Sequence, residues 1–372
     1  MQVRNIVFFL GREPKLSAAE IRAVFSDSSS ITIKENRLFL ATDQDIRPET
    51  LITKLGGTIK IAEEISTEGS LNEAIADYLE QSANGNKIHF SLAGDGGKPL
   101  ALAVKKILKE RGVSVRYIEP KNSATILHND LIKRQSDLTV IGKRLYVTRA
   151  LQPFEAFGER DFGRPGRDSK SGMLPPKLAQ MMINLSGAQK DEIVLDPFCG
   201  SGTILSEAVL LGYGCLVGSD LSDKAIADTK KNLLWLGDTY DALSHVKLIQ
   251  SDIARLPSHL PPRSIDTIIT EPYMGKPLTG TESKEHIMSQ AHELKLLYKE
   301  AFAACAKILK PQGTILFIFP SFEKNGQWVS TVPTADIEKM GFVPISFDAD
   351  PYLIYMRPKQ HLAREIRKFR LR

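Results

Sequence analysis

Apolar and polar positions follow two different patterns along the chain, and the change falls near residue 160. Beyond it, short apolar runs alternate with segments in which apolar residues recur every three or four positions. This alternation predicts strands at 192–195, 214–219, 246–250, 265–269, 314–319, 344–347 and 353–356, and helices at 203–211, 223–236, 284–309 and 334–340. Strands alternating with helices predict a Rossmann-like α/β domain with a mostly parallel, doubly wound sheet. No clear helix separates the last two strands, so we expect an antiparallel hairpin at one edge.

The first 155 residues alternate more weakly and predict two small α+β domains. The first, at 1–60, has strands at 3–10, 31–34 and 37–40 and a helix at 17–25, as in a ferredoxin-like unit. The second, at 61–155, has strands at 87–92, 113–118 and 138–141 and helices at 71–81 and 100–111. A glycine-rich, charged stretch at 158–172 lacks an apolar period and predicts a linker or an ordered functional loop, and we place the linker at 156–190. The C-terminal domain then covers 191–358.

Bulk composition narrows the class of protein. The chain has 372 residues, enough for two or three domains, and its 42% hydrophobic and 25% charged residues are ordinary for a water-soluble protein. The apolar run at 6–10 is too short for a signal peptide or a membrane span, so we expect a cytoplasmic protein with no membrane partner. The three cysteines form no CxxC pair, which favours neither a disulfide framework nor a metal site.

The net charge of +5 is concentrated in one place. Residues 359–372 carry six Lys and Arg against one Glu, which equals the whole excess. We interpret this stretch as a basic tail. Such a tail can pair with phosphates, although a solvated terminal helix without a partner would have the same composition.

A glycine-containing loop between the strand at 192–195 and the helix at 203–211 is the strongest chemical motif. Glycines let the backbone approach a ligand where a Cβ would collide. A pyrophosphate site would carry a third glycine, whereas an acid here repels phosphate and suits the cationic amino group and sulfonium of S-adenosylmethionine. The loop predicts this cofactor, held by Asp196, Pro197, Phe198, Cys199, Gly200, Ser201, Gly202 and Thr203.

Two further acids follow the next strands. Asp220, before Leu221, can accept hydrogen bonds from ribose hydroxyls, and Asp252, before Ile253, can accept one from an adenine amino group. Either acid alone could simply cap a helix or turn. Three acids after three successive strands, beside Gly-x-Gly, predict a nucleoside pocket.

The fourth strand ends in Glu271-Pro272-Tyr273. Amino-group methyltransferases carry Asp/Asn-Pro-Pro-Tyr/Phe at this place. The acid or amide accepts an N–H of the base, the proline stiffens the turn, and the ring stacks on the base. Here Glu replaces Asp or Asn and one proline is absent. We predict that Glu271, Pro272 and Tyr273 are catalytic; the alternative is a polar strand-end turn with a packed tyrosine.

Together these motifs resemble the THUMP-domain tRNA guanine-N2-methyltransferases and their bacterial relatives. The resemblance covers most of the chain through residues 8–21, 160–165, 171–179 and 196–203. It implies a ferredoxin-like unit, a THUMP domain that grips the acceptor end of tRNA, and a methyltransferase domain that acts on the N2 of a guanosine near position 10. It also implies that residues 173–179 close over the methionine end of the cofactor.

Cations in the linker fit an RNA substrate, since arginine pairs well with phosphate. The predicted RNA contacts are Arg160, Arg164, Arg167 and Lys170. A structured loop whose arginines pair with nearby acids is the alternative.

Two other functions remain open at this point. A DNA amino-methyltransferase shares the same donor and acceptor logic, but the chain has no recognisable helix-turn-helix or target-recognition insert. A non-catalytic RNA-binding protein that retains the fold gains weight from the altered Glu-Pro-Tyr motif. The sequence does not reveal an activating subunit, the target nucleotide or the oligomeric state.

Overall fold

The computed structural model describes residues 3–25, 31–83, 87–167, 173–242, 245–324, 326–358 and 360–372. The chain divides into two compact units, which are described separately. The N-terminal unit comprises residues 1–14, 27–54 and 58–153, and the C-terminal unit comprises residues 15–26, 55–57 and 154–372. No helix in these described ranges is long and apolar enough to cross a membrane.

The N-terminal unit is built on one eight-stranded sheet, with the strand order β2-β3-β1-β4-β8-β7-β5-β6. The strands are β1 (Arg4–Leu10), β2 (Ile31–Lys34), β3 (Arg37–Thr42), β4 (Thr58–Ile65), β5 (Ile88–Gly94), β6 (Val115–Tyr117), β7 (Asp137–Ile141) and β8 (Arg144–Leu151). The pairing of β4 with β8 joins the two predicted small domains into a single sheet. The predicted boundary at residue 60 is therefore wrong, because it cuts β4.

Strands β4 and β8 escaped prediction because charged residues interrupt their apolar pattern. Glu63 accepts hydrogen bonds from Nε of Arg4, at 2.6 Å, and from Nε of Arg149, at 3.0 Å, so three neighbouring strands are tied by one carboxylate. Its pKa is lowered, since these two guanidinium groups outweigh the effect of burial.

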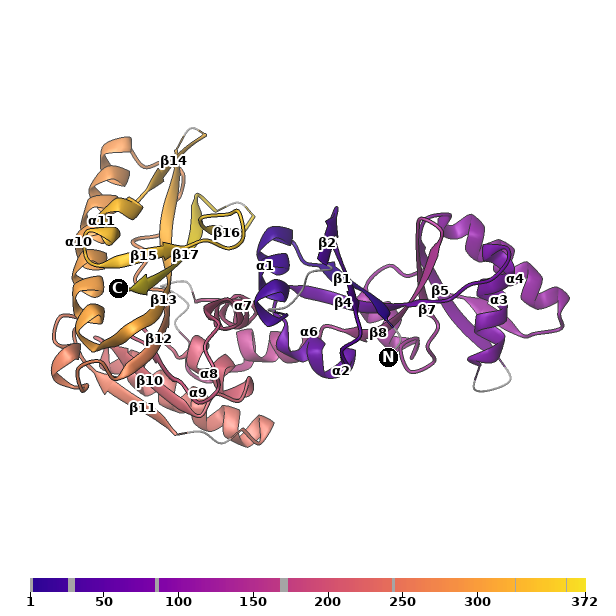
Figure 1. Cartoon of the computed structure of the whole chain (residues 1–372), viewed down its shortest axis with the longest axis horizontal. Helices are drawn as coiled ribbons and strands as arrows, with labels where there is room; N and C mark the ends of the chain where they lie inside the picture. The colour runs from indigo at the N-terminus through magenta and orange to yellow at the C-terminus, as the bar shows by residue number, and fades with distance from the viewer. Residues whose placement is uncertain are drawn as a thin grey trace. The chain divides into compact units, whose positions relative to one another are not determined.

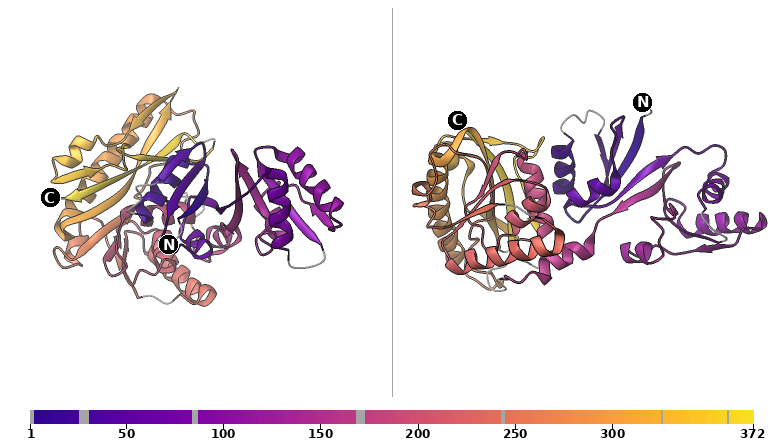
Figure 2. Two further views of the ribbon diagram at one scale, coloured as in Figure 1. Left: turned by 45° about the vertical axis from the view of Figure 1, so that its right-hand side comes forward. Right: turned by 90° about the horizontal axis from the view of Figure 1, so that it is seen from below.

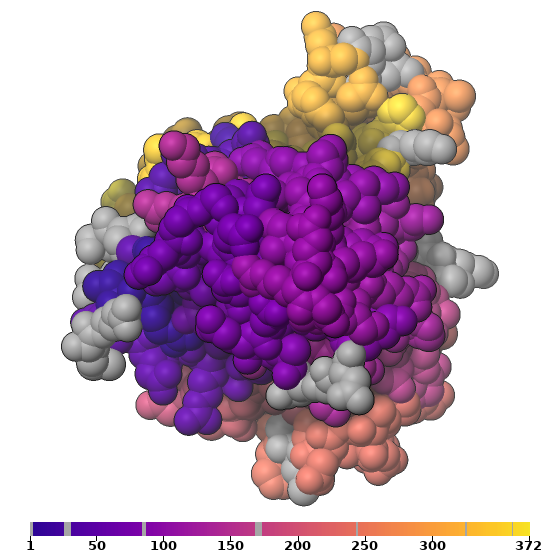
Figure 3. Space-filling model, turned by 90° about the vertical axis from the view of Figure 1, so that its right-hand side faces the viewer, coloured from indigo at the N-terminus to yellow at the C-terminus, as the bar shows by residue number. Residues whose placement is uncertain are grey.

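Helices cover one part of this sheet. The unit contains α2 (Pro48–Leu51), η1 (Ile52–Lys54), α3 (Leu71–Gln81), α4 (Gly97–Glu110) and α5 (Ser123–His128). Helices α3 and α4 lie side by side against β5 and β7 (Figure 1 and Figure 2). Figure 3 looks onto this side of the unit, where the purple surface that includes α3 and α4 faces the viewer.

Helix α1 (Pro14–Val24) packs with the C-terminal unit, not with the domain at 1–60 in which it was predicted. Its buried Glu20 accepts hydrogen bonds from the backbone N–H groups of Gly56 and Gly57 and from the Asn184 amide, each at 2.8 Å. Burial raises the pKa of Glu20 to about 7. Gly56 also lies close to the backbone at residue 177, because a Cβ at Gly56 would be only 2.1 Å from the Lys177 carbonyl oxygen. Only a glycine allows this close contact.

The C-terminal unit has the predicted doubly wound architecture. Its main sheet has the order β11-β10-β9-β12-β13-β17-β15, with β14 paired to β13 and β16 paired to β17. The strands are β9 (Ile193–Asp196), β10 (Cys215–Asp220), β11 (Val246–Gln250), β12 (Ile265–Thr270), β13 (Leu309–Lys324), β14 (Gln327–Ser330), β15 (Phe342–Ile345), β16 (Leu353–Met356) and β17 (Leu362–Leu371). Strands β9 to β13 pair in parallel.

Helices cover both faces of this sheet. They are α6 (Phe154–Gly158), the π-helical turn η2 (Glu159–Gly163), α7 (Pro176–Ser186), α8 (Thr203–Leu210), α9 (Asp223–Tyr240), η3 (Leu256–Ser258), α10 (Lys284–Ile308) and α11 (Thr334–Glu338). One apolar core lies between the sheet and α10, and a second lies between the other face and α7 and α8. Within the predicted linker at 156–190, the end of α6, the turn η2 and helix α7 are regular structure, so these residues match the alternative of an ordered segment.

The predicted basic tail is strand β17. It lies antiparallel between β13 and β15, so the expected hairpin between 344–347 and 353–356 is also wrong: β15 and β16 each pair with β17. Apolar residues such as Ile366 and Phe369 alternate with the charges and are fully buried. The charge run concealed this strand, because Arg364 and Arg367 are buried in ion pairs and do not face solvent.

Candidate active site

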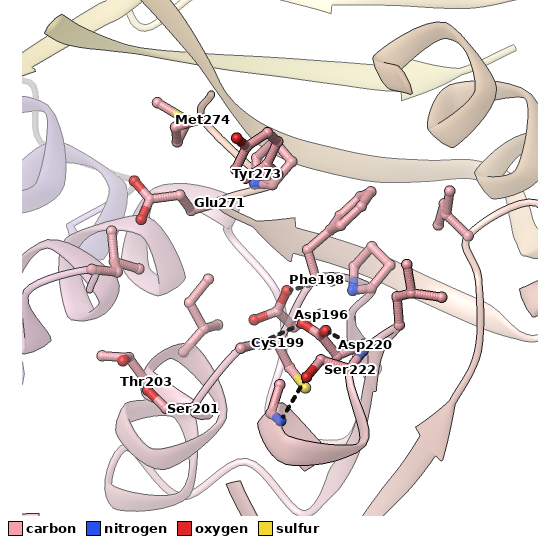
Figure 4. Close-up of a pocket in the computed structure, with 18 of the residues that line it drawn as sticks. Asp196, Phe198, Cys199, Ser201, Thr203, Asp220, Ser222, Glu271, Tyr273 and Met274 are labelled. Atoms are coloured by element: carbon pink, nitrogen blue, oxygen red, sulfur yellow. Dashed lines mark hydrogen bonds between the residues drawn. The ribbon is translucent and has the colours of Figure 1, made fainter. Parts of the chain in front are cut away.

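A cavity of about 610 Å³ opens at the carboxyl ends of the parallel strands β9, β10, β11 and β12 (Figure 4). This edge is where ligands bind in open α/β sheets. The predicted donor residues that line it are Asp196, Pro197, Phe198, Cys199, Gly200, Ser201, Thr203, Asp220, Leu221, Asp252 and Ile253. The predicted acceptor residues Glu271, Pro272 and Tyr273 line the same cavity.

Asp196 ends β9 and is almost fully buried. Its Oδ1 accepts hydrogen bonds from the Thr270 hydroxyl, at 2.7 Å, and from the backbone N–H of Phe198, at 3.2 Å. Burial raises the pKa of Asp196 to about 7, and the nearby charges of Asp220 and Glu271 add to the rise. A positive group in the cavity would reverse this effect and favour the ionised form.

The glycine loop begins α8. Gly200 and Gly202 have φ of +53° and +81°, a region that side chains other than glycine rarely adopt. No atom lies within 4 Å of the place that a Cβ on Gly200 would take, so this glycine leaves space beside the cavity. Gly202 does not line the cavity; a Cβ there would lie 2.7 Å from Thr229, whose hydroxyl donates to the Gly200 carbonyl oxygen.

Asp220 holds this loop from the end of β10. Its Oδ2 accepts a hydrogen bond from the backbone N–H of Gly200 and its Oδ1 accepts one from Ser222, both at 2.9 Å. Asp252 follows β11, is exposed, and accepts a hydrogen bond from the backbone N–H of Ala254 at 2.9 Å. Both acids therefore cap local turns and also border the cavity. A capping role and a ligand-binding role are compatible for each of them.

The wall of the cavity is strongly acidic. The carboxylates among its lining residues are Asp196, Asp220, Asp228, Asp252, Glu271 and Glu300. Lys224 is the one Lys or Arg among those described lining residues, and its Nζ lies 2.5 Å from Asp228. Such a wall excludes a pyrophosphate and suits a ligand with positive charge. The residues present therefore fit S-adenosylmethionine better than a dinucleotide.

Glu271 follows β12 on the opposite side of the cavity from Asp220, and in Figure 4 Glu271, Tyr273 and Met274 lie above Asp196 and Asp220. Its Oε1 accepts a hydrogen bond from Nε of Arg364 at 2.6 Å, and both side chains are at least nine-tenths buried. The Tyr273 side chain is half exposed at the cavity, as expected of a ring that is available for stacking.

Helix α10 supplies two residues that the sequence motifs did not identify. The buried Tyr298 hydroxyl donates to the carbonyl oxygen of Tyr273 at 2.6 Å. The Gln290 side chain accepts from the backbone N–H of Lys276, at 3.0 Å, and donates to its carbonyl oxygen, at 3.2 Å. These contacts brace the turn after Pro272. The sequence did contain a signal for these two residues: Gln290 and Tyr298 are polar positions, eight residues apart, on the buried face of a long predicted helix.

Two predicted RNA contacts are wrong, because the side chains are buried. Arg160 donates to both carboxylate oxygens of Glu207, at 2.6 and 3.1 Å. Arg164 donates to the Thr203 hydroxyl at 2.6 Å and contacts the Met173 sulfur. Since 8% and 4% of these two residues are exposed, they stabilise the fold and cannot contact phosphate.

The segment around these arginines is held against α9. Asn232 accepts a hydrogen bond from the Gly166 N–H at 2.7 Å and donates to the Gly166 and Ser201 carbonyl oxygens. Arg167 is exposed, and its Nη1 donates to the Phe162 carbonyl oxygen at 3.1 Å. Lys170 lies outside the described residues. Just after that stretch, Met173 and Leu174 line the cavity.

The cavity thus has a donor side and an acceptor side. The donor side combines a glycine loop with acids at the ends of three strands, which suits a cationic nucleoside cofactor. The acceptor side combines a carboxylate, a proline turn and an exposed ring, which suits a planar base with an amino group. Methyl transfer between two bound molecules is the chemistry that this arrangement favours.

Comparisons with known proteins agree with this description. Residues 164–341 match the family model described as UPF0020, RMKL-like, methyltransferase domain. A protein of Methanothermococcus thermolithotrophicus named "Probable tRNA (guanine(10)-N2)-dimethyltransferase" is 32% identical over 141 residues, which cover 38% of this chain and 78% of that protein. The chain belongs to the tRNA guanine-N2-methyltransferase family.

Other relatives, and one solved structure that shares the fold, match to different extents. The tRNA (guanine(10)-N2)-dimethyltransferase of Methanothermobacter thermautotrophicus is 38% identical over 152 residues, which are 41% of this chain and only 40% of that protein. The Pyrococcus abyssi enzyme of the same name is 25% identical over 85% of this chain and 88% of its own length. The crystal structure of TrmN from Thermus thermophilus has the same fold over the whole of both chains, with a TM-score of 0.55 and 15% identity.

Proposed function

We propose that this chain transfers a methyl group from S-adenosylmethionine to the N2 atom of a guanosine in tRNA, near position 10. The observation that carries the proposal is that Glu271 and Tyr273 share one cavity with the three strand-end acids. Support for the substrate comes from family members that are named for guanine 10 of tRNA and match up to 85% of this chain. One further relative, from Thermus thermophilus, is named for guanine 6, so the position is the least constrained part of the proposal.

The donor side would hold the cofactor through its acids and its loop. Asp196 would face the cationic amino group, Asp220 the ribose hydroxyls, and Asp252 the adenine edge, each as an acceptor. When bound, S-adenosylmethionine supplies an electrophilic methyl group on a sulfonium. The apolar lining by Phe198 and Ile253 would exclude water from this group.

The acceptor side would hold and orient the base. An exocyclic amine conjugated with a purine ring is a weak nucleophile, so its lone pair must be aimed at the methyl carbon. The carboxylate of Glu271 and a main-chain carbonyl of this turn would accept its two N–H bonds, while Tyr273 would offer a stacking surface. Tyr298 and Gln290 limit movement of the turn that carries these groups.

We further propose that the N-terminal unit is a ferredoxin-like and THUMP region that binds RNA in the cytoplasm. Residues 58–153 contain 14 Lys and Arg against 11 Asp and Glu. A second cavity, of about 550 Å³, opens in this unit beside Phe9, whose ring has the Lys60 ammonium 4.4 Å and the Arg37 guanidinium 5.9 Å from its centre. An aromatic face flanked by cations is a common platform for unpaired nucleotides.

The decisive experiment incubates the purified chain with radiolabelled S-adenosylmethionine and a mixture of unmodified tRNA transcripts, with duplex DNA as a parallel substrate. We expect label in tRNA, N2-methylguanosine or its dimethyl form by mass spectrometry, and loss of label in Glu271→Ala. Label in DNA alone would replace the proposal by a DNA amino-methyltransferase. Donor binding without transfer to any nucleic acid would also reject it.

A further inference from the structure

Two buried arginines of β17 lie on opposite faces of the sheet and have different partners. Arg367 pairs with Glu365 of its own strand and donates to the Val332 carbonyl oxygen at 2.7 Å, on the face that α10 covers. Arg364 pairs with Glu271, 93 residues away, on the face that α7 and α8 cover. Only the second pair reaches a residue that lines the cavity.

The Arg364–Glu271 pair spans three strands. Strand β13 lies between β12, which ends one residue before Glu271, and β17, which carries Arg364 opposite Pro320. Neighbouring strands are about 4.8 Å apart, so the backbone of Arg364 in β17 lies roughly 10 Å across the sheet from β12, the strand that precedes Glu271. The Arg364 and Glu271 side chains together cover this span, and the Arg364 guanidinium centre lies 6.0 Å from the centre of the Tyr355 ring.

The Arg364 guanidinium is buried and incompletely hydrogen-bonded. Arg364 is 6% exposed, and its Nη1 has no hydrogen-bond partner within the described ranges. A buried donor without a partner is unfavourable, but Arg164 and Arg367 each have such an atom at Nε, so the partner of Arg364 and not this cost is what distinguishes it. The bond that Arg364 does make is charge-assisted and is directed at Oε1 of Glu271.

We propose that Arg364 is the positioning residue for Glu271, so that the pair acts as one neutral acceptor. This inference rests on the proposed function. The glutamate side chain has one more rotatable bond than the Asp or Asn of related motifs, and Arg364 removes that freedom by holding Oε1. The Oε2 atom then serves the base amine. Because the guanidinium balances the carboxylate charge, the pair is neutral overall, like the Asn form of the Asp/Asn-Pro-Pro-Tyr/Phe motif.

A double-mutant cycle tests this proposal directly. Arg364→Met leaves an uncompensated buried carboxylate, Glu271→Gln leaves an uncompensated guanidinium, and the double variant leaves a neutral amide with no charge to balance. We expect kcat to fall in both single variants. If the two losses were independent, they would multiply in the double variant; we expect the kcat of the double variant to be about tenfold or more above that multiplied value. Arg364→Lys should recover part of the activity, and Arg364→Gln replaces Arg364→Met if that variant does not fold.

The matched control is Arg367→Met, which removes a buried arginine from the same strand on the opposite face. We expect it to lower Tm while kcat stays within about threefold of the wild-type value. Affinity for S-adenosylhomocysteine, measured by calorimetry, should be unchanged in both arginine variants. Purely multiplicative effects on kcat, or an affinity loss in Arg364→Met as large as its loss of kcat, would overturn the proposal.

The proposed function and this inference fail in different ways. If the wild-type chain methylates tRNA but the cycle shows no coupling, only the role of Arg364 is rejected. If the wild-type chain methylates no nucleic acid, the proposed function is rejected, and crystal structures of the wild-type chain and Arg364→Met decide the inference. A Glu271 carboxylate that leaves its position supports it, and an unmoved carboxylate overturns it.

Discussion

The two sides of the cavity are built by different means. On the donor side, Asp220 and Asp252 are fixed by backbone N–H groups no more than 20 residues away, and Asp196 accepts a hydrogen bond from the Thr270 hydroxyl of the adjacent strand, 74 residues away. On the acceptor side, Glu271 depends on an arginine that is 93 residues distant in sequence. The donor side is therefore mostly local and complete once β12 is in place, whereas the acceptor side also requires β17, the last strand of the sheet.

This difference separates the two steps that the site must perform. Local turns around a glycine loop can hold a cofactor that many methyltransferases share. Under the proposed function, the contacts that would aim an amine are specific to one substrate and use elements from across the unit. We therefore expect changes on the acceptor side to affect turnover, and changes on the donor side to affect cofactor binding.

The largest expected effect is that of Glu271→Ala. Loss of the carboxylate removes an acceptor for the base amine and leaves Arg364 buried without its partner. We expect kcat for methyl transfer to fall by about 10²–10³-fold, measured with radiolabelled donor at saturating tRNA. The dissociation constant for S-adenosylhomocysteine should stay within a few fold. A variant that bound the cofactor poorly but turned over normally would contradict the division between the two sides.

Asp220→Ala is expected to have the next largest effect, on the opposite side. It removes the acceptor for the Gly200 N–H and the proposed acceptor for a ribose hydroxyl, and charged hydrogen bonds of this kind are worth about 1.5–3 kcal/mol each. We expect calorimetry to show about ten- to hundredfold weaker binding of S-adenosylhomocysteine. Turnover at saturating cofactor should change much less. Cys215→Ala is a suitable control, because that exposed side chain does not line the cavity.

Tyr273→Leu tests the stacking surface. Base stacking on an aromatic ring contributes about 1–3 kcal/mol, so we expect KM for tRNA to rise by about tenfold or somewhat more. Tyr273→Phe should behave like the wild-type chain, because the ring and not the hydroxyl makes the contact. Equal loss in both variants would show that the hydroxyl matters and that stacking does not explain the role of Tyr273.

The smallest expected effect is a pH dependence on the donor side. Burial raises the pKa of Asp196 to about 7, so the unliganded protein binds a proton there below that pH. A cationic amino group favours the ionised form, and cofactor binding must then release the proton. We expect affinity for S-adenosylhomocysteine to rise by about tenfold between pH 6 and pH 8. Asp196→Asn, which keeps an oxygen for Thr270, should abolish this rise.

Stability without ligand has the opposite pH dependence. A carboxyl group whose pKa is raised on folding stabilises the fold in its neutral form, and this contribution is lost as pH rises from about 4 to about 7. Asp196 and Glu20 both belong to this class. Denaturant unfolding at pH 5 and pH 8 should therefore show lower stability at the higher pH.

The sequence was sufficient to predict the parallel sheet and the residues at its carboxyl edge. Gly-x-Gly and strand-end acids at regular spacing report local geometry, and most of these residues line one cavity. Burial of charge was not predictable in the same way. Arg160, Arg164 and Arg364 resemble solvent-exposed cations in a one-dimensional pattern, because their partners Glu207, Thr203 and Glu271 lie far away in sequence. The partnership of α1 with the C-terminal unit escaped prediction for the same reason.

Strand β17 also bears on how the chain is made. It is synthesised after β15 and β16 but lies between β13 and β15 in the sheet. In a nascent chain that ends at β16, the edges of β13 and β15 that later pair with β17 therefore have unpaired backbone N–H and C=O groups. Such edges invite wrong pairing and aggregation during translation. Until residues 362–371 emerge from the ribosome, Glu271 also lacks its arginine. We therefore expect the donor side to form earlier on the ribosome than the acceptor side, which separates cofactor capture from the onset of catalysis in time.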